Sequence, residues 1–438
     1  MAEIFPFRAL RYNPDVAPLA EVVTQPYDKI TPRMQEDYYR ASPYNLVRII
    51  LGKSEPADDA GHNVYTRAAE YLADWKKAGV LSADPDPSIY LYSQRFPVPR
   101  PMASGDAAWH ERKGFISVAR LHDYSEGIIY RHEQTHAGPK ADRLNLLRAT
   151  RTHFGQLFML YSDPGKQIEK LLEPGRAADM EVTDEYGVLH RVWKFSEPAV
   201  ISAVAAVMSD KKLVIADGHH RYETALAYRN QRRLEAGGTP DPGAAYECVM
   251  MTCINMADPG LVILPTHRVI FGLQGFDGEA VLPRLGKFFR VTPLGKELDA
   301  AAAMARLAGA EKNESVMVAA FSSGMFLLTP LPGAAESLLG GLSSRQRALD
   351  VVQLHNVLLQ EVLQVSEEAV RNLRHIRYVR DPAEALAQVR DGADAAFLLN
   401  PVPVQKMRDV AFAGEVMPQK STDFYPKLLS GLTMYAVD

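Results

Sequence analysis

The sequence predicts a mixed α/β protein of two or three domains. Its 438 residues are enough to bury a large core and to form more than one domain. Strand and helix patterns alternate within residues 375–410, as they do in α/β folds. An apolar run at residues 213–216 is followed by Asp217-Gly218 and then by a helical pattern, which predicts a strand, a glycine turn and a helix.

Residues 1–105 are the first predicted domain. Thr31-Pro32 is a typical helix start, because threonine caps a helix and proline fits its first turn. Residues 97–105, which contain three prolines and a glycine, are the clearest candidate for a linker or a long hairpin loop. Hydrophobic periodicity predicts the regular elements of this part: a strand at 44–51, a helix at 64–81 and a strand at 88–98.

Residues 106–274 are the predicted central domain, and residues 275–438 are the predicted C-terminal α/β domain. In the central domain we expect strands at 115–121, 154–162, 246–256 and 261–271, with helices at 140–153 and 198–208. In the C-terminal domain we expect helices at 298–308, 349–363, 382–389 and 403–410, paired strands within 315–331, and strands at 375–379 and 395–399.

Charge and composition exclude several classes of protein. A net charge of −4 offers no basic surface for nucleic acid, so no nucleic-acid partner is expected. Cys248 and Cys253 both lie in an apolar run, so we expect them to be reduced and buried, as in a cytoplasmic protein. The N-terminus lacks the layout of a signal peptide, and no apolar stretch reaches the roughly 18 residues of a membrane helix.

The segment Asp217-Gly218-His219-His220-Arg221 is the strongest functional signal. A strand, a glycine and a helix start direct free backbone N–H groups at an anion. Two histidines and an arginine in a first helical turn oppose the helix dipole unless something negative, such as phosphate, is bound there. Gly218 allows close approach, Arg221 can hold phosphate with two hydrogen bonds, and Asp217 suits a metal ion or a substrate hydroxyl. The alternative is a solvated helix start that is merely basic.

These five residues and the alanine-bearing helix after them resemble the signature of the ParB/sulfiredoxin-like superfamily, especially its free serine kinases. His219 stands where sulfiredoxins have their catalytic cysteine, so sulfinic-acid reduction is not expected. The whole chain resembles the domain-of-unknown-function family 1015. That resemblance rests on six segments: Gln25-Pro26-Tyr27-Asp28, Ser42-Pro43-Tyr44-Asn45, His132-Glu133-Gln134-Thr135, Asp142-Arg143-Leu144, Leu264-Pro265-Thr266-His267-Arg268 and Met417-Pro418-Gln419-Lys420-Ser421-Thr422.

The resemblance implies a ParB/sulfiredoxin-like central domain with kinase chemistry. Glu133 matches the glutamate that serves as general base in the serine kinases, although an ion pair with Arg131 or Arg143 would explain it equally well. The implied cofactor is ATP or ADP with Mg²⁺, and the implied acceptor is a small molecule, L-serine or a related hydroxy amino acid. His132-Glu133-Gln134-Thr135-His136 also spells the zinc-hydrolase pattern, but Gly138-Pro139 leaves little room for the helix which that pattern requires.

Other candidate ligands are dispersed along the chain. His267 and Arg268 follow an apolar run and are expected at a strand end, where α/β proteins bind ligands. Lys420 begins a Lys-Ser-Thr segment that resembles a phosphate-contacting loop, and Tyr27 with Asp28 could line the same site.

The leading hypothesis is therefore a small-molecule phosphotransferase. Its catalytic residues would be Glu133, Asp217, His219 and His220, its nucleotide contacts Gly218, Arg221, His267, Arg268 and Lys420, and its metal ligand Asp217. A non-catalytic nucleotide-binding switch of ParB type is the main alternative. A nuclease and a zinc hydrolase acting through His132, Glu133 and His136 are the remaining alternatives.

Overall fold

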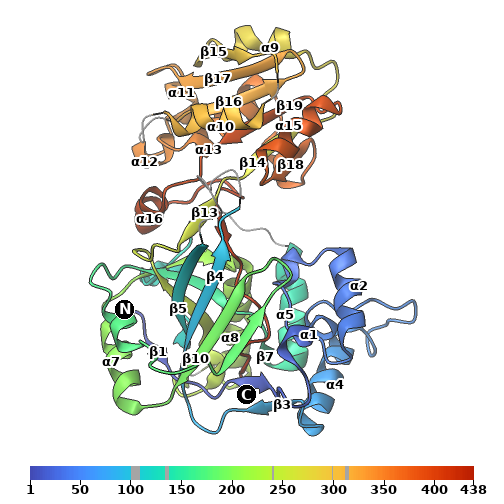
Figure 1. The fold of residues 1–438 in the computed structure, drawn as a ribbon, viewed down its shortest axis with the longest axis vertical. Helices are drawn as coiled ribbons and strands as arrows, with labels where there is room; N and C mark the ends of the chain where they lie inside the picture. Colours follow the sequence, from blue (N-terminus) through green and yellow to red (C-terminus); the bar gives the residue numbers. More distant parts are fainter. Residues whose placement is uncertain (100–108, 134–137, 239–240, 298, 311–314) are drawn as a thin grey trace.

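Two large β-sheets organise the chain, one in the lower and one in the upper half of the molecule as seen in Figure 1. The structure is a computed structural model that describes residues 1–99, 109–133, 138–238, 241–297, 299–310 and 315–438. Helices accompany both sheets, so the mixed α/β class is confirmed.

The lower sheet has nine strands, and most of its neighbouring pairs are antiparallel. The parallel pairs are β6 with β11 and β8 with β12. Along the sheet the order is β6 (Ile129–Tyr130), β11 (Leu213–Asp217), β8 (Leu157–Tyr161), β12 (Cys248–Asn255), β5 (Trp109–Arg120), β4 (Ile89–Pro97), β10 (Leu189–Phe195) and β9 (Met180–Thr183), with β1 (Ile4–Phe5) paired to β5. Strands from both sides of the predicted 105/106 boundary pair in this sheet, so strand pairing does not follow that boundary.

Helices accompany the lower sheet, and most of them bury apolar side chains against it or against each other. α8 lies beside α5, while α1 to α4 form the flank at the right of Figure 1. The helices are α1 (Leu19–Val22), α2 (Pro32–Ala41), α3 (Val47–Ile50), α4 (Val64–Lys77), α5 (Gly138–Thr150), α6 (Gln167–Leu171), α7 (Pro198–Met208) and α8 (His219–Glu235). Thr31 caps α2 and Pro32 opens it, as predicted.

The upper sheet has six strands. Their order is β15 (Phe289–Gly295), β17 (Gly324–Pro330), β16 (Met317–Phe321), β19 (Ala395–Leu399), β14 (His267–Ile270) and β18 (Ile376–Val379). The helices of this half are α9 (Gly278–Leu285), α10 (Ala300–Ala308), α11 (Glu336–Leu339), α12 (Ser344–Arg347), α13 (Asp350–Gln353), α14 (Glu367–Arg371), α15 (Pro382–Arg390) and α16 (Val404–Phe412), together with the π-helix η4 (Leu354–Val362).

The segment after α16 returns from the upper half to the lower half. It pairs first as β20 (Asp423–Tyr425) with β13 (Val262–Leu264), and then as β21 (Tyr435–Ala436) with β7 (Thr152–His153). Figure 1 shows this red segment running down beside the lower sheet. Residues late in the sequence therefore lie next to β11 and α8.

Four sequence predictions about local structure were wrong. Residues 44–51 contain the helix α3, not a strand, because Leu46 and Ile50 lie one turn apart and both bury in the core around Trp75. The helix predicted to reach residue 81 ends at Lys77, since Gly79 is left-handed, with φ of 71°.

The single strand predicted at 261–271 is broken into β13 and β14. Pro265 lies at the break and has no N–H to donate to a sheet. The helix predicted at 349–363 is also divided, since α13 passes into the π-helix η4 at Leu354.

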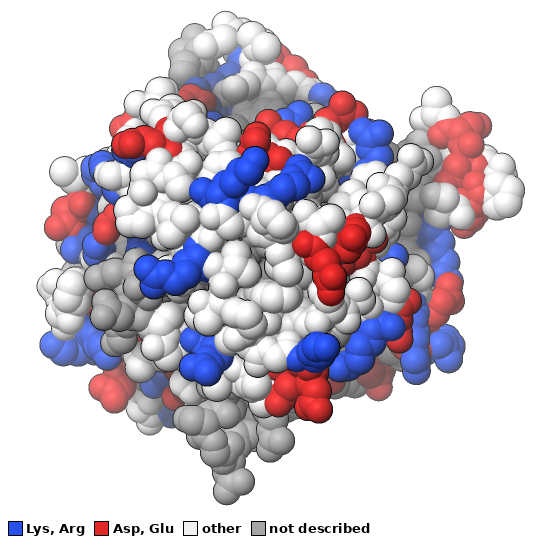
Figure 2. All heavy atoms as spheres, turned by 90° about the horizontal axis from the view of Figure 1, so that it is seen from above, with Lys and Arg blue, Asp and Glu red and all other residues white. Residues whose placement is uncertain are grey.

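Charged side chains are mixed on the visible surface. Figure 2, which views the molecule from above, shows Lys and Arg interspersed with Asp and Glu and separated by neutral areas. Among the helices that the structure describes, none combines the length and the apolar character needed to cross a membrane. The predicted linker at 97–105 falls largely outside the described residues, because 100–108 are not described.

Candidate functional site

The turn between β11 and α8 is built around Gly218. Its φ of 99° lies in the left-handed region, and a Cβ at this position would meet Leu157 Cδ2 at 2.9 Å. No side chain among the described residues caps α8, and the first N–H groups of an α-helix have no acceptor within the helix. The amides that follow Gly218 are therefore available to an anion.

Asp217 ends β11 and is held between two cations. Its Oδ2 accepts a hydrogen bond from Arg221 Nη2 at 2.8 Å, and its Oδ1 accepts one from Lys427 Nζ at 2.8 Å. Burial alone would raise the pKa of Asp217, but Lys427 and Arg221 hold that pKa far below its usual range. Asp217 is therefore an ionised carboxylate whose two oxygens already face positive charge.

Lys427 joins Asp217 to a second acidic residue. Its Nζ also lies 3.2 Å from Asp423 Oδ1, and Asp423 in turn accepts a hydrogen bond from Arg380 Nη2 at 3.0 Å. Burial opposes the charged form of Lys427, but the two aspartates outweigh it and raise the pKa of the lysine above its usual value. The ion pairs form one chain from Arg221 through Asp217, Lys427 and Asp423 to Arg380.

Glu133 follows β6 and holds the segment 417–422. Its Oε1 accepts from the Thr422 amide and the Thr422 hydroxyl, both at 2.8 Å, and its Oε2 accepts from the Lys420 amide at 3.2 Å. Burial would raise the pKa of Glu133, but hydrogen bonding to His132, the nearby histidines and Thr422 lower it to about 2. A carboxylate in this state is a weak proton acceptor at neutral pH.

His132 also holds the segment 417–422 through hydrogen bonds. Its Nδ1 donates to the Ile215 carbonyl at 2.6 Å, and its Nε2 lies 2.7 Å from Thr422 Oγ1. Its own carbonyl accepts from the Met417 amide at 2.8 Å. Both ring nitrogens are thus engaged within the protein.

The helical geometry of the zinc-hydrolase pattern is not supported. His132 and Glu133 lie in non-helical backbone, and α5 begins only at Gly138, while His136 lies outside the described residues. In the described part of the chain, no group of three or more His, Cys, Asp or Glu side chains is placed to hold a metal ion.

His219 and His220 open α8 beside this network. The ring of His219 lies 4.9 Å from that of His132, centroid to centroid. Burial, followed by the neighbouring His132, lowers the pKa of His219 to about 3, so its imidazole is neutral at pH 7. Its buried Nε2 has no hydrogen-bond partner among the described residues. His219 can therefore donate or accept a hydrogen bond, but it does not supply the positive charge that its position suggested.

The start of α8, Glu133 and the ion pairs of Asp217, Lys427, Asp423 and Arg380 line one pocket of about 490 Å³, and His132 is buried behind it. The N-terminal residues Tyr27 and Asp28, whose contribution the sequence left open, line it as well. Its basic residues come from four separate parts of the chain: Lys29, Arg221, Arg380, Lys420 and Lys427. The pocket has four acidic residues against these five basic ones: Asp28, Glu133, Asp217 and Asp423.

His267 and Arg268 do not line this pocket. Both are buried on β14, where His267 Nδ1 accepts from the Leu399 amide at 3.2 Å. Burial lowers the pKa of His267 to about 3. Arg268 Nη2 donates to the Lys420 carbonyl at 3.0 Å, so Arg268 stabilises the Lys420 segment without lining the pocket. Thr266, two residues before Arg268, does line the pocket.

Lys29, Arg380 and Asp423 also line the pocket, although no sequence pattern predicted them as site residues. Lys29 follows Pro26-Tyr27-Asp28, one of the segments that resemble family 1015, and this position was the only sequence feature that could have indicated a role for Lys29. Arg380 and Asp423 lie in stretches that carry no motif, and only the fold brings them to the pocket.

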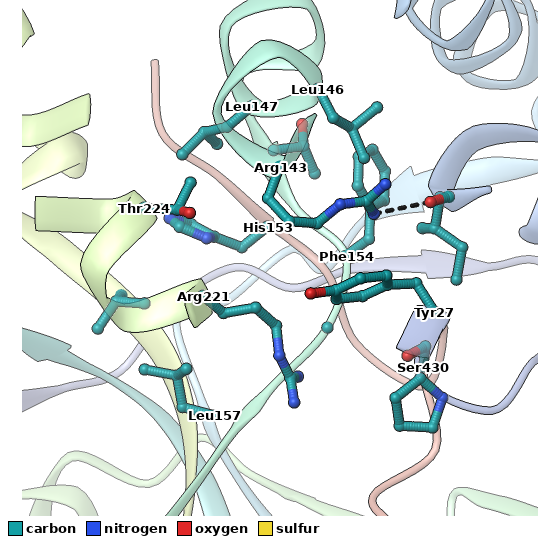
Figure 3. A pocket seen from close by; sticks show the side chains of 15 residues that line it. Tyr27, Arg143, Leu146, Leu147, His153, Phe154, Leu157, Arg221, Thr224 and Ser430 are labelled. Carbon is teal, nitrogen blue, oxygen red and sulfur yellow. Dashed lines mark hydrogen bonds between the residues drawn. The ribbon is translucent and has the colours of Figure 1, made fainter. Parts of the chain in front are cut away.

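A smaller cavity of about 70 Å³ adjoins the pocket and shares Tyr27 and Arg221 with it. Figure 3 shows this cavity, with Arg143 beside the ring of Tyr27 and Arg221 extending from the start of α8. The Arg143 guanidinium carbon lies 4.1 Å from the centre of that ring, and its Nη1 donates to the Ile50 carbonyl at 2.7 Å. Apolar side chains such as Leu146 and Leu157 complete the lining.

The fold and the site define a mixed α/β protein with a cation-rich pocket formed by residues from both halves. The sequence matches the DUF1015 family, described as proteins of unknown function, over residues 4–352. The chain belongs to this family.

Other comparisons give distant similarity. No curated protein matches the sequence. A conserved hypothetical protein from Pyrococcus furiosus has 15% identity and a TM-score of 0.36, with 73% of this chain and 95% of that chain covered. A free serine kinase variant in complex with ADP has 13% identity and a TM-score of 0.37, with coverage of 74% and 92%. SbnI from Staphylococcus aureus, truncated at its C-terminus, has 11% identity and a TM-score of 0.34, with coverage of 73% and 87%.

Proposed function

We propose that the pocket binds the phosphates of a nucleotide and transfers the terminal phosphoryl group to a small hydroxylated molecule. The observation that carries this proposal is the uncapped first turn of α8, which opens into a pocket with five Lys and Arg side chains. Backbone amides and basic side chains are the groups with which proteins hold phosphate.

The charge distribution supports an anionic ligand. Arg221, Arg380 and Lys427 are already paired with aspartates. Lys29 and Lys420, in contrast, have no ion-pair partner within the described ranges, and they line the same pocket. Burial, together with the neighbouring Lys427, lowers the pKa of Lys29, which is the effect expected for a lysine beside other cations. A phosphate group would supply the missing negative charge.

The proposed reaction needs few reactive side chains. The acceptor oxygen forms a bond to the terminal phosphorus, the bond from that phosphorus to the bridging oxygen breaks, and the shortened nucleotide leaves. Positioning and charge neutralisation do most of the work in such transfers. Mg²⁺ would neutralise phosphate charge, and Asp28 would be its carboxylate ligand in the pocket, because both oxygens of Asp217 are bonded to Arg221 and Lys427.

We assign Glu133 a positioning role within this proposal. Its acceptor positions are used by Lys420 and Thr422, and a pKa of about 2 is poorly matched to proton abstraction at pH 7. His219 Nε2, which has no partner among the described residues, can hydrogen-bond the acceptor hydroxyl, but with a pKa of about 3 His219 is also a weak base, so we assign it an orienting role. The ParB/sulfiredoxin-like character of the central part and an acceptor such as L-serine belong to the same proposal, and both rest on the sequence resemblance.

A non-catalytic nucleotide switch is the second candidate. The observation that favours it is the lowered pKa of both Glu133 and Asp217, which leaves neither carboxylate suited to act as a base. The two candidates differ in whether bound nucleotide is consumed when serine and other hydroxylated acceptors are added.

The test is a thermal-shift panel of ADP, ATP, CTP and GTP, each with and without Mg²⁺. A ligand that binds only the folded state stabilises it by about 2.7 kcal/mol at a concentration 100 times its Kd. We expect at least one nucleotide to stabilise the wild type, with a much smaller effect on Lys420→Met. Lys76→Met, which removes an exposed lysine from α4, is the matched control and should respond like the wild type. If no nucleotide stabilises the wild type, both the kinase and the switch are excluded.

A further inference from the structure

Another cavity, of about 240 Å³, lies in the upper half of the molecule. It is lined by residues of the π-helix η4, of α14 and of the segment before Lys420. Of its lining residues only Gln419 also lines the pocket described above. The proposed function does not use this cavity.

The π-helix brings three polar side chains to the cavity wall: His355, Asn356 and Gln360. In an α-helix, residues 355 and 360 would point roughly 140° apart, because each residue advances by about 100°. In a π-helix, hydrogen bonds join residues five positions apart, so these two residues come close to the same side. π-Helical turns are rare and occur frequently at functional sites.

His355 is nine-tenths buried and lines the cavity, with 8% of its surface exposed. Its Nε2 has no hydrogen-bond partner in the part of the chain that the structure describes. Leaving such a group unpaired is unfavourable, and a ligand that bonds to it would recover that loss. Burial lowers the pKa of His355 to about 3, so the ring is neutral at pH 7.

Carboxamides supply most of the other polar groups in the lining. Gln346 Nε2 donates to the Val416 carbonyl at 2.9 Å, and Asn356 Nδ2 donates to the Val352 carbonyl at 3.2 Å, so protein contacts orient both side chains. Gln360 and Gln419 add two more carboxamides. The charged residues Glu367 and Arg371 form an ion pair at 2.8 Å and cancel each other.

The lining therefore has no net charge but offers many paired donors and acceptors. A charged ligand would lose its hydration without finding an opposite charge free to receive it. A carboxamide presents a hydrogen-bond donor beside an acceptor. It therefore complements a molecule that has an acceptor and a donor side by side on one edge. The apolar walls, which include Leu342 and Val352, suit the faces of a small ring.

We infer that this cavity is a binding site for a small uncharged heterocycle or amide with adjacent hydrogen-bond donors and acceptors, such as a nucleobase. His355 and Gln360 are the residues that recognise its polar edge. The site is distinct from the phosphate pocket, because its recognition does not involve Lys420 or the start of α8, and the two share only Gln419 in their linings.

The experiment is calorimetric titration of the full chain with uracil, cytosine, adenine and hypoxanthine. At least one of these should bind the wild type, and its affinity should fall at least tenfold in His355→Leu and in Gln360→Leu. Gln360 is exposed, so its replacement tests the site even if the buried His355→Leu variant does not fold. Gln388→Leu on α15 is the matched control and should bind like the wild type.

Three results would overturn the inference. The first is that none of the four compounds binds the wild type. The second is that Gln360→Leu binds with unchanged affinity. The third is that Lys420→Met abolishes binding while His355→Leu and Gln360→Leu retain it, which would place the compound in the phosphate pocket. Loss in the cavity variants with retention in Lys420→Met supports the inference, whether or not the protein binds nucleotides.

Discussion

Replacing Lys427 with methionine should destabilise the protein strongly. Lys427 Nζ lies 2.8 Å from Asp217 and 3.2 Å from Asp423, and only 10% of the lysine side chain is exposed. Methionine keeps the length of the side chain but leaves two largely buried carboxylates with one cation fewer. Removal of one partner from a buried ion pair typically costs about 3–5 kcal/mol, and we expect a loss of this order.

The loss should depend on pH in a defined way. The folded-state pKa of Asp217 is depressed, so its ionised form contributes stability above the unfolded value of about 4, and that contribution is lost as pH falls toward the folded value. The folded-state pKa of Lys427 is raised, so its contribution is present below about 10.4 and is lost at higher pH. The difference between wild type and Lys427→Met should be largest near neutral pH and smaller at pH 3.5.

Urea unfolding followed by circular dichroism measures this difference. A double-mutant cycle with Asp217→Asn isolates the pair, and we expect a coupling energy of about 2–3 kcal/mol at pH 7. Lys76→Met, an exposed substitution on α4, should change the stability by no more than about 0.5 kcal/mol. A coupling energy below about 0.5 kcal/mol at pH 7 would refute the electrostatic role assigned to Lys427.

Three further predictions concern the start of α8 and the segment that Glu133 holds. Gly218→Ala places a Cβ at a φ of 99° and 2.9 Å from Leu157, so it should cost about 1–3 kcal/mol in a thermal melt; an unchanged melting temperature would contradict the close packing of this turn. Glu133→Gln should raise KM for nucleotide more than it lowers kcat, since Glu133 holds the Lys420 segment; a collapse of kcat with unchanged KM would instead identify Glu133 as the base. The folded-state pKa of His219 is depressed to about 3, whereas the unfolded value is about 6.5. As the pH drops below about 6.5, the unfolded chain therefore binds a proton that the folded chain does not, and the wild type loses stability. His219→Gln should lose less stability between pH 7 and pH 4.5, which melting temperatures at the two pH values measure.

Elements whose pattern is local could be predicted from the sequence. The helix at 198–208 and the strand at 395–399 have the predicted bounds, because Pro198 fixes the helix start and the strand is a short apolar run between polar residues. Residues 44–51 are also largely apolar, yet they contain the helix α3. Their periodicity could not distinguish a strand from a helix, since Leu46, Ile49 and Ile50 pack into a core that only the tertiary structure supplies.

The same distinction applies to the site. Residues 217–221 could be recognised because a strand, a glycine and a helix start are adjacent in the sequence. Lys29, Arg380 and Asp423 could not, because each reaches the pocket through long-range packing and has no neighbours that indicate a role. Arg268 looked like a ligand at a strand end, and the structure shows it buried behind the Lys420 segment.

The pairing of Asp217 with Lys427 also orders events during synthesis. The two residues are 210 positions apart, so at about 5–20 residues per second the lysine leaves the ribosome roughly 10–40 s after the aspartate. In that interval β11 and α8 can form, but Asp217 lacks one of its two cations and the wall made by residues 419–427 is missing. The growing chain therefore has no complete pocket, and ligand capture has to wait until the returning segment docks.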